Sequence, residues 1–411
     1  MSRKTAFVGF SYMAGLLQAS FFSAPLSIAI GAVLLGFGLC TVFIFRPKHS
    51  GSFYRSAVCA IACCVGLWIY SGYDMTVCRN ITANIGNFSG TVTIEQSTVY
   101  SEEKAFYIAH CTFPNGASGN VGFFDRRSDL VKGDKITLSG QLYAPENTGF
   151  FNSADYYRSM NVFLLMKSVR TSGYEIKEHN FYRTLDDFRH NVSDTIRKYV
   201  PSEEGELLIG MLFGSSKWNM SDRTENLLYR AGIGHVAAVS GLHMSVAAGI
   251  AAALAIALRL PKWGQFISVT AVSLLFAMTA GFTPSVVRSL IMVTFVWAAG
   301  IFNRRSDSLT SLAAAIIIMT ISSPFIVRST SFLLSVSGTI GTAVLSPMFI
   351  NAYEKKMERK TDLPYHVGAL TSALCSSLCA AAAVFPVSAL TFDQISIASP
   401  LTNLLLSPLC T

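Results

Sequence analysis

Three side chains that could take part in chemistry lie in one of the most apolar runs of the sequence. They are His235, Ser240 and His243, within the stretch His-Val-Ala-Ala-Val-Ser-Gly-Leu-His-Met. On a helix the three fall within about 140° of one another, so they can share one face. Lipid solvates ionisable groups poorly, which favours a bundle interior or a water-filled passage around them. Gly241 lets a neighbouring helix approach closely.

Other readings of this stretch remain open. The polar groups could form hydrogen bonds between helices without contacting any substrate. An intramembrane serine protease would use Ser240 with a histidine base, but three residues apart on one helix Ser240 and His243 share a direction poorly suited to attack. A metal held by the two histidines lacks nearby carboxylate or cysteine ligands. We therefore expect no catalytic residue, no metal and no cofactor.

Arg288 is also unusual, because it is a charged residue in an apolar run. It follows Ser285 in Gly281-Phe-Thr-Pro-Ser-Val-Val-Arg-Ser289. Its side chain could extend outward to the membrane interface. It could instead line a passage beside Ser285 and contact phosphate groups.

The composition predicts an integral membrane protein. The 411 residues are 51% hydrophobic and 14% charged, with a mean hydropathy of +0.44, whereas soluble domains carry roughly 25% charged residues. The first apolar run lacks a cleavage site and is read as a retained helix. About ten runs are long enough to cross a bilayer. They lie near 7–23, 25–45, 56–73, 237–258, 264–280, 284–302, 309–326, 330–349, 366–390 and 397–411.

Basic residues predict the orientation of these helices. With the N-terminus inside, the inner segments hold Arg3, Lys4, Arg46, Lys48, Arg55, Arg259, Lys262, Arg304, Arg305, Lys355, Lys356, Arg359 and Lys360. This asymmetry accounts for most of the net charge of +8 and places residues 75–234 outside the cytoplasmic membrane.

The outer segment alternates between apolar and polar residues, which is typical of half-buried strands. We expect strands at Gly90–Gln96, Ala105–Phe113, Val121–Phe124, Asp134–Tyr143 and Asn161–Arg170, with a helix around Ser153–Met160. Five short strands suggest a small barrel of the OB type, although a small sandwich would leave a similar pattern. The aromatic side chains are candidates for stacking on single-strand bases, with barrel core as the alternative. They are Tyr100, Tyr107, Phe123, Phe124 and Tyr143.

The predicted organisation has four parts. Transmembrane helices occupy 1–74, the OB-like β domain 75–180, amphipathic and interfacial or re-entrant helices 181–234, and a transmembrane channel domain 235–411. The outer domain holds two of the nine cysteines, Cys78 and Cys111. An oxidising compartment favours a disulfide between them.

Several stretches resemble, in order, the signature of the ComEC competence protein family. They are Gly205–Gly214, Tyr229–His243, Gly281–Ser289 and Ser399–Leu405, with Asn147–Tyr156 similar to the end of the family's extracellular domain. The resemblance covers roughly residues 80–411. It implies an inner-membrane channel that admits single-stranded DNA during natural transformation, with His235, Ser240, Gly241, His243, Ser285 and Arg288 along the path.

The resemblance also implies partners and a departure from the family. The implied partners are single-stranded DNA, the lipid bilayer, the DNA-receptor and helicase proteins of a competence machinery, and further copies of the chain in a homo-oligomer. The hydrolase motif His-x-His-x-Asp-His of longer members does not occur in this sequence, so we expect no enzyme activity. The sequence stops inside an apolar run and is expected to be a truncated form. A transporter of another polar solute is the alternative function.

Overall fold

The computed structural model describes residues 4–44, 51–101, 104–127, 129–146, 153–176, 180–214, 221–230, 241–361, 367–392 and 402. Its contacts divide the chain into two compact units, each of which is described by itself. The first comprises Met1–Thr195 with Ala313–Ser329, and the second comprises Ile196–Leu312 with Thr330–Thr411.

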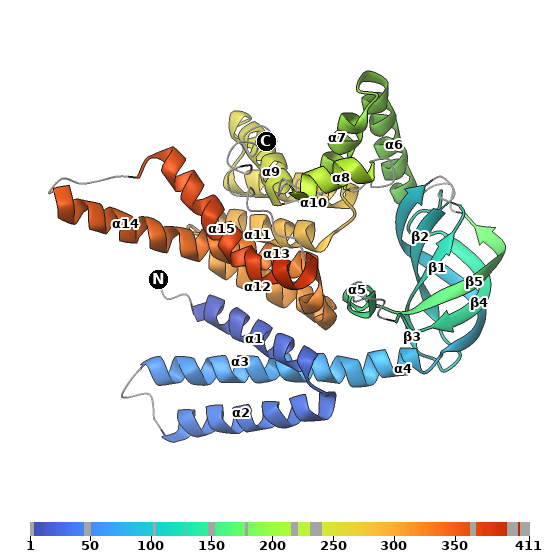
Figure 1. Ribbon diagram of the computed structural model, residues 1–411, viewed down its shortest axis with the longest axis horizontal. Coiled ribbons are helices and arrows are strands. Elements are labelled where there is room, and N and C mark those ends of the chain that lie inside the picture. The colour runs from blue at the N-terminus through green and yellow to red at the C-terminus, as the bar shows by residue number, and fades with distance from the viewer. Residues whose placement is uncertain are drawn as a thin grey trace. The chain divides into compact units, whose positions relative to one another are not determined.

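The first unit begins with three helices that lie side by side, α1 (Lys4–Phe21), α2 (Ala24–Ile44) and α3 (Gly51–Tyr73) (Figure 1). Helices α1 and α3 approach so closely that a Cβ on Gly15 would lie 2.0 Å from the carbonyl oxygen of Cys63. A Cβ on Gly66 would lie 2.3 Å from the carbonyl oxygen of Tyr12. Small residues at both positions therefore permit backbone contact, which is typical of helix pairs in membranes.

Helix α3 continues without interruption through the wide turn η1 (Asp74–Cys78) and α4 (Arg79–Thr82) to the start of the barrel. Ile81 packs on β3, since a Cβ on Gly119 would lie 2.4 Å from its Cδ1 atom. The side-chain amide of Asn115 donates to the carbonyl oxygen of Asn80 at 2.8 Å. Apolar contact and one hydrogen bond thus hold this helix end to the barrel.

The expected disulfide between Cys78 and Cys111 is absent, and this corrects the sequence-based prediction. Both residues are buried free thiols. The Cys111 Sγ atom donates to the carbonyl oxygen of Gly119 on the neighbouring strand at 3.7 Å. Each thiol therefore behaves as a small apolar group inside the fold.

Five strands close into a small barrel in the order β1-β2-β3-β5-β4. They are β1 (Gly86–Ser101), β2 (Lys104–Thr112), β3 (Ser118–Asp125), β4 (Lys135–Tyr143) and β5 (Val162–Glu175), with α5 (Ser153–Ser159) before the last strand. Strands β3 and β5 pair in parallel, and every other neighbouring pair is antiparallel. The five strands predicted by alternation are confirmed, and their closure confirms a barrel.

The segment Ala313–Ser329 belongs to the first unit. It includes the end of α12 (Ser308–Ser322) and the short helix η3 (Pro324–Arg328). The Phe325 ring lies edge-on to Tyr70, with centroids 4.9 Å apart, and to Phe163 of β5 at 5.6 Å. A buried aromatic side chain far along the chain therefore joins the third helix to the barrel.

Helix α6 (Phe181–Tyr199) confirms the predicted amphipathic helix. Its first turn is held to the barrel, because the Arg183 guanidinium binds the fully buried Asp134 carboxylate at 2.8 Å. Further along the helix, Phe188 and Tyr199 are exposed.

The second unit contains the remaining helices. They are α7 (Glu203–Phe213), α8 (Asp222–Arg230), α9 (Gly241–Ala257), α10 (Lys262–Thr279), α11 (Pro284–Ile301), α13 (Thr330–Ile340), the wide turn η4 (Gly341–Leu345), α14 (Ser346–Thr361) and α15 (Ala369–Phe392). Apolar side chains join α9, α10 and α11 through two clusters, one around Met244, Ala277 and Val286 and the other around Ala248, Ala252 and Val269.

The predicted apolar runs from 7–23 to 366–390 each coincide with a helix, whereas the run 397–411 falls almost entirely outside the described residues. Within the described part of the chain, four helices are long and apolar enough to cross a membrane. They are Arg55–Thr82, Pro284–Ile301, Thr330–Lys360 and Thr371–Thr391. The chain is thus mostly helical, with one small barrel.

Candidate functional site

Three helices of the second unit, α9, α11 and α13, bring a group of polar side chains together. Helix α11 begins sharply, because Gly281 adopts a φ of +78° and Pro284 occupies the first turn after Thr283. Proline suits this position, where its missing N–H is not needed. The next turn of α11 carries Arg288.

Arg288 is only 8% exposed, although it lies in an apolar helix. Its Nη1 atom donates to the hydroxyl of Thr339 on α13. The Nη2 atom donates to the Ser289 hydroxyl at 3.3 Å, and Nη1 also meets the sulfur of Met292 at 3.6 Å. The side chain is therefore directed between helices and does not extend outward to a membrane interface.

The hydroxyl groups around Arg288 are oriented by their own helices. Ser289 donates to the carbonyl oxygen of Ser285 at 2.9 Å, and Thr339 donates to that of Ser335 at 2.9 Å. Each proton is thereby committed to the backbone, which leaves the hydroxyl oxygens as acceptors for the guanidinium. The Ser285 and Ser335 hydroxyls lie 3.3 Å apart and complete the contact between α11 and α13.

Gly241 brings α9 against the same group. A Cβ at this position would lie 2.8 Å from the Ser289 Oγ atom and 3.2 Å from the Arg288 Nη2 atom. Glycine therefore allows the α9 backbone to approach the guanidinium. Gly241, Ser285 and Arg288, which come from two separate motifs, meet at this point.

Two of the residues predicted from the first motif, His235 and Ser240, lie outside the described residues. His243 is described and is partly buried in the first turn of α9. Whether the three share one face remains a prediction.

Sequence reasoning missed Ser289, Ser335 and Thr339. A signal for two of them was present, because Ser331, Ser335 and Thr339 recur every four residues in a largely apolar run. Such spacing places polar groups along one face of a helix. The same helix widens into the π turn η4 two residues after Thr339, at Gly341. Wide turns of this kind are frequent at functional sites.

The candidates for base stacking divide between the inside and the outside of the barrel. Tyr107 and Phe123 are completely or almost completely buried in its interior, so they are core residues and the stacking prediction is wrong for them. Phe124 is 45% exposed, and the Lys104 Nζ atom lies 5.2 Å from its ring centroid. Tyr143 is partly buried, with the Lys167 Nζ atom 5.7 Å from its ring. The Tyr100 side chain is not among those described.

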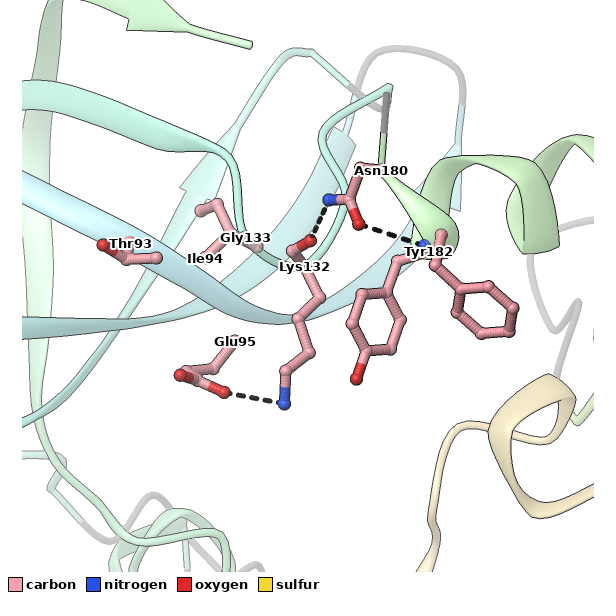
Figure 2. Close-up of a pocket in the computed structure, with 8 residues that line it drawn as sticks. Thr93, Ile94, Glu95, Lys132, Gly133, Asn180 and Tyr182 are labelled. Carbon is pink, nitrogen blue, oxygen red and sulfur yellow. Dashed lines mark hydrogen bonds and ion pairs between the residues drawn. The ribbon is translucent and has the colours of Figure 1, made fainter. Parts of the chain in front are cut away.

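A shallow pocket of about 290 Å³ lies where the barrel meets the start of α6 (Figure 2). Lys132 reaches across it to Glu95 at 2.9 Å, and Asn180 donates to the carbonyl oxygen of Lys132 at 2.6 Å. Asn180 also accepts from the backbone N–H of Tyr182 at 3.1 Å, and so caps α6. The charges of Lys132 and Glu95 already pair with each other. We therefore interpret the pocket as the junction between the barrel and α6.

Comparisons with known proteins point to one family. Residues 211–411 match the family model described as Competence protein. ComE operon protein 3 of Bacillus subtilis (strain 168) is 23% identical over 285 residues, which cover 69% of this chain and 35% of that protein. The chain thus spans about a third of the length of this curated relative. No solved structure matches the chain.

Proposed function

We propose that this chain, whose residues 211–411 match the competence protein family model, acts in competence as part of the inner-membrane channel for single-stranded DNA. The strand would pass among the helices of the second unit and enter the cytoplasm. Channel activity is a proposal for this chain, because the chain spans only about a third of the length of the longer relative.

The observation that carries the proposal is the buried, hydroxyl-lined guanidinium of Arg288. An arginine within membrane helices normally faces a bundle interior or a water-filled cavity. Around it, Ser285, Ser289, Ser335 and Thr339 form a polar surface contributed by two helices. Such a surface suits a polyanion that must leave water without losing all polar contacts.

We further propose that the barrel is of the OB type and lies outside the membrane. Closure of five strands, with a helix before the last, supports this assignment. Lys104 over Phe124 and Lys167 over Tyr143 combine a cation with an aromatic ring on strands of the barrel. Proteins that bind single strands use the same combination, so these pairs would contact bases and phosphates.

The same buried arginine would also suit a transporter of a small polar anion, and this is the second candidate function. In both functions the chain is a conduit and carries no catalytic residue. DNA-receptor and helicase proteins, and further copies of the chain, are the partners expected of a channel in a competence machinery.

The test is DNA entry in cells of the source organism, with and without this gene. Labelled DNA is supplied, and the label that reaches the cytoplasm as a single strand is measured. The proposal expects the label to stay outside in the deletion strain and to enter again when the gene is restored. Unchanged DNA entry in the deletion strain would exclude the channel and leave the small-anion transporter.

A further inference from the structure

We propose that Arg288, with the hydroxyls around it, binds one phosphodiester anion of the transported strand at a time. This inference rests on the proposed function and gives it a specific contact. At the junction of α9, α11 and α13, the ligand group is a phosphodiester, the cation is Arg288 and the neutral partners are the surrounding hydroxyls.

The charge of Arg288 has no counter-charge among the described residues. Between residues 231 and 353 the sequence holds one acidic residue, Asp307. That carboxylate accepts from the backbone N–H of Thr310 at 3.0 Å and from its hydroxyl at 2.8 Å, at the start of α12. Buried charges in proteins are normally paired, so the structure leaves a place for an anion from outside the chain.

The donors of the guanidinium point to the same conclusion. A guanidinium has five N–H donors, and the acceptors that Arg288 finds are the neutral hydroxyls of Ser289 and Thr339 and the sulfur of Met292. Its Nε atom is buried and has no hydrogen-bond partner within the described part of the chain. Phosphate and carboxylate oxygens are the groups that a guanidinium binds best, through two parallel hydrogen bonds.

Gly241 lets the α9 backbone pack against the Nη2 side of the guanidinium. With a Cβ there, a methyl group would lie 3.2 Å from Nη2 and 2.8 Å from the Ser289 hydroxyl oxygen. A bare backbone at residue 241 therefore leaves the Nη2 atom and its hydroxyl partner free of a side chain from α9. The donor left for the anion is therefore the buried Nε atom, which has no hydrogen-bond partner among the described residues.

A single cation suits a ligand that must be released again after it binds. Conduction requires contacts strong enough to admit the ligand and weak enough to release it. One arginine surrounded by neutral hydroxyls offers each successive phosphate the same modest contact. A cluster of cations would hold the strand in place. A lipid headgroup is a poorer occupant, because the side chain is buried between helices and does not reach outward.

The experiment measures binding of a fluorescein-labelled oligothymidylate to the full chain in nanodiscs of phosphatidylcholine, as anisotropy over a range of salt concentrations. Arg288→Gln is expected to weaken binding about tenfold, since it removes one charged hydrogen-bonding group. The slope of log affinity against log salt should fall by about 0.7, the contribution of one phosphate on a single strand. Arg304→Gln makes the same change at an exposed arginine in a loop and should leave both quantities unchanged.

Gly241→Ala supplies a second variant that keeps the charge, in case Arg288→Gln does not yield monodisperse protein. It should weaken oligothymidylate binding several-fold, because the added methyl group lies against Nη2 and Ser289. Wild-type affinity in the variant that folds would overturn the inference. It would also be overturned if phosphatidylglycerol in the nanodisc abolished the difference between wild type and Arg288→Gln, because the occupant would then be a lipid headgroup.

Failure of this inference can be told apart from failure of the proposed function. If deletion of the gene stops DNA entry in cells but Arg288→Gln restores it fully at matched membrane abundance, the channel stands and the phosphate contact does not. If deletion leaves DNA entry unchanged, the channel itself is excluded.

Discussion

The guanidinium of Arg288 on α11 donates a hydrogen bond to the hydroxyl of Thr339 on α13, fifty-one residues further along the chain. Thr339 in turn donates to the carbonyl oxygen of Ser335. The hydroxyl therefore acts both as an acceptor for a buried cation and as a donor to its own helix. This relationship joins two helices at the point where the helix that carries Thr339 widens into a π turn.

Thr339→Val should destabilise the helical unit, because it removes the oxygen acceptor that Nη1 uses. A hydrogen bond to a charged group contributes about 1.5–3 kcal/mol. We expect a lower thermal unfolding midpoint for the full chain in detergent, together with reduced DNA entry. Thr342→Val is the matched control, since the Thr342 hydroxyl bonds only to carbonyl oxygens of its own helix. Equal midpoints for the two variants would contradict the interhelical role of Thr339.

Ser118 and Asn303 test the orientation of the chain. Both side chains are exposed, one on β3 and the other after α11. A cysteine at Ser118 should react with an impermeant maleimide on intact cells, whereas one at Asn303 should react only after lysis, because basic residues mark the inner loops. Labelling is measured relative to the parent chain, which carries its own cysteines. The reverse pattern would invert the topology.

Asp134→Asn should destabilise the barrel more than the loss of an exposed ion pair would. The Asp134 carboxylate is fully buried, and it accepts from Arg183 at 2.8 Å and from the Val131 N–H at 3.0 Å. Breaking a fully buried pair costs about 3–5 kcal/mol, and the loss here should be smaller, because the Arg183 side chain is 24% exposed. Hydrogen exchange of the β4 amides in the full chain should accelerate accordingly. Asp129→Asn, in the exposed pair with Arg127, should cost at most about 1 kcal/mol.

The buried thiol of Cys111 should make the free energy of unfolding fall as the pH rises above 9. Burial raises the pKa of its thiol from 9.0 to about 12. The unfolded chain loses this proton near pH 9 while the folded chain retains it, so the thiol's contribution to stability is complete below pH 9 and is lost as the pH rises toward 12. Thermal unfolding midpoints should therefore fall less steeply above pH 9 in Cys111→Ala than in the wild type. Parallel curves would show that the folded thiol titrates normally.

His243→Leu should impair DNA entry more than Ser240→Ala at matched membrane abundance. If both residues face a wet passage, the leucine makes its wall apolar, whereas loss of one hydroxyl removes a single neutral contact. A serine nucleophile would reverse this order, because its removal abolishes the chemistry. Null activity in Ser240→Ala with retained activity in His243→Leu would revive the protease hypothesis.

Local patterns in the sequence were sufficient to predict most of the elements. Alternation predicted β1 to β5, and an amphipathic helix was predicted where α6 lies, because each pattern reflects which face of a single element is buried. Apolar length predicted α1, α2, α3, α9, α10, α11, α12, α13 and α15, because a long continuous apolar run is typical of a helix that crosses a membrane.

Relationships between distant segments required the tertiary structure. Phe123 and Phe124 are neighbours on one strand and must face opposite sides, but barrel closure decided that Phe123 is core and Phe124 is exposed. An oxidising compartment favours a disulfide wherever two thiols meet, yet the packing of Ile81 on Gly119 joins the helix to the barrel without one. Arg288 was recognisable as an unusual residue from the sequence. Its partner Thr339 was not, because hydroxyls in apolar helices usually bond to their own backbone, and only helix packing selects the one that also accepts from a distant cation.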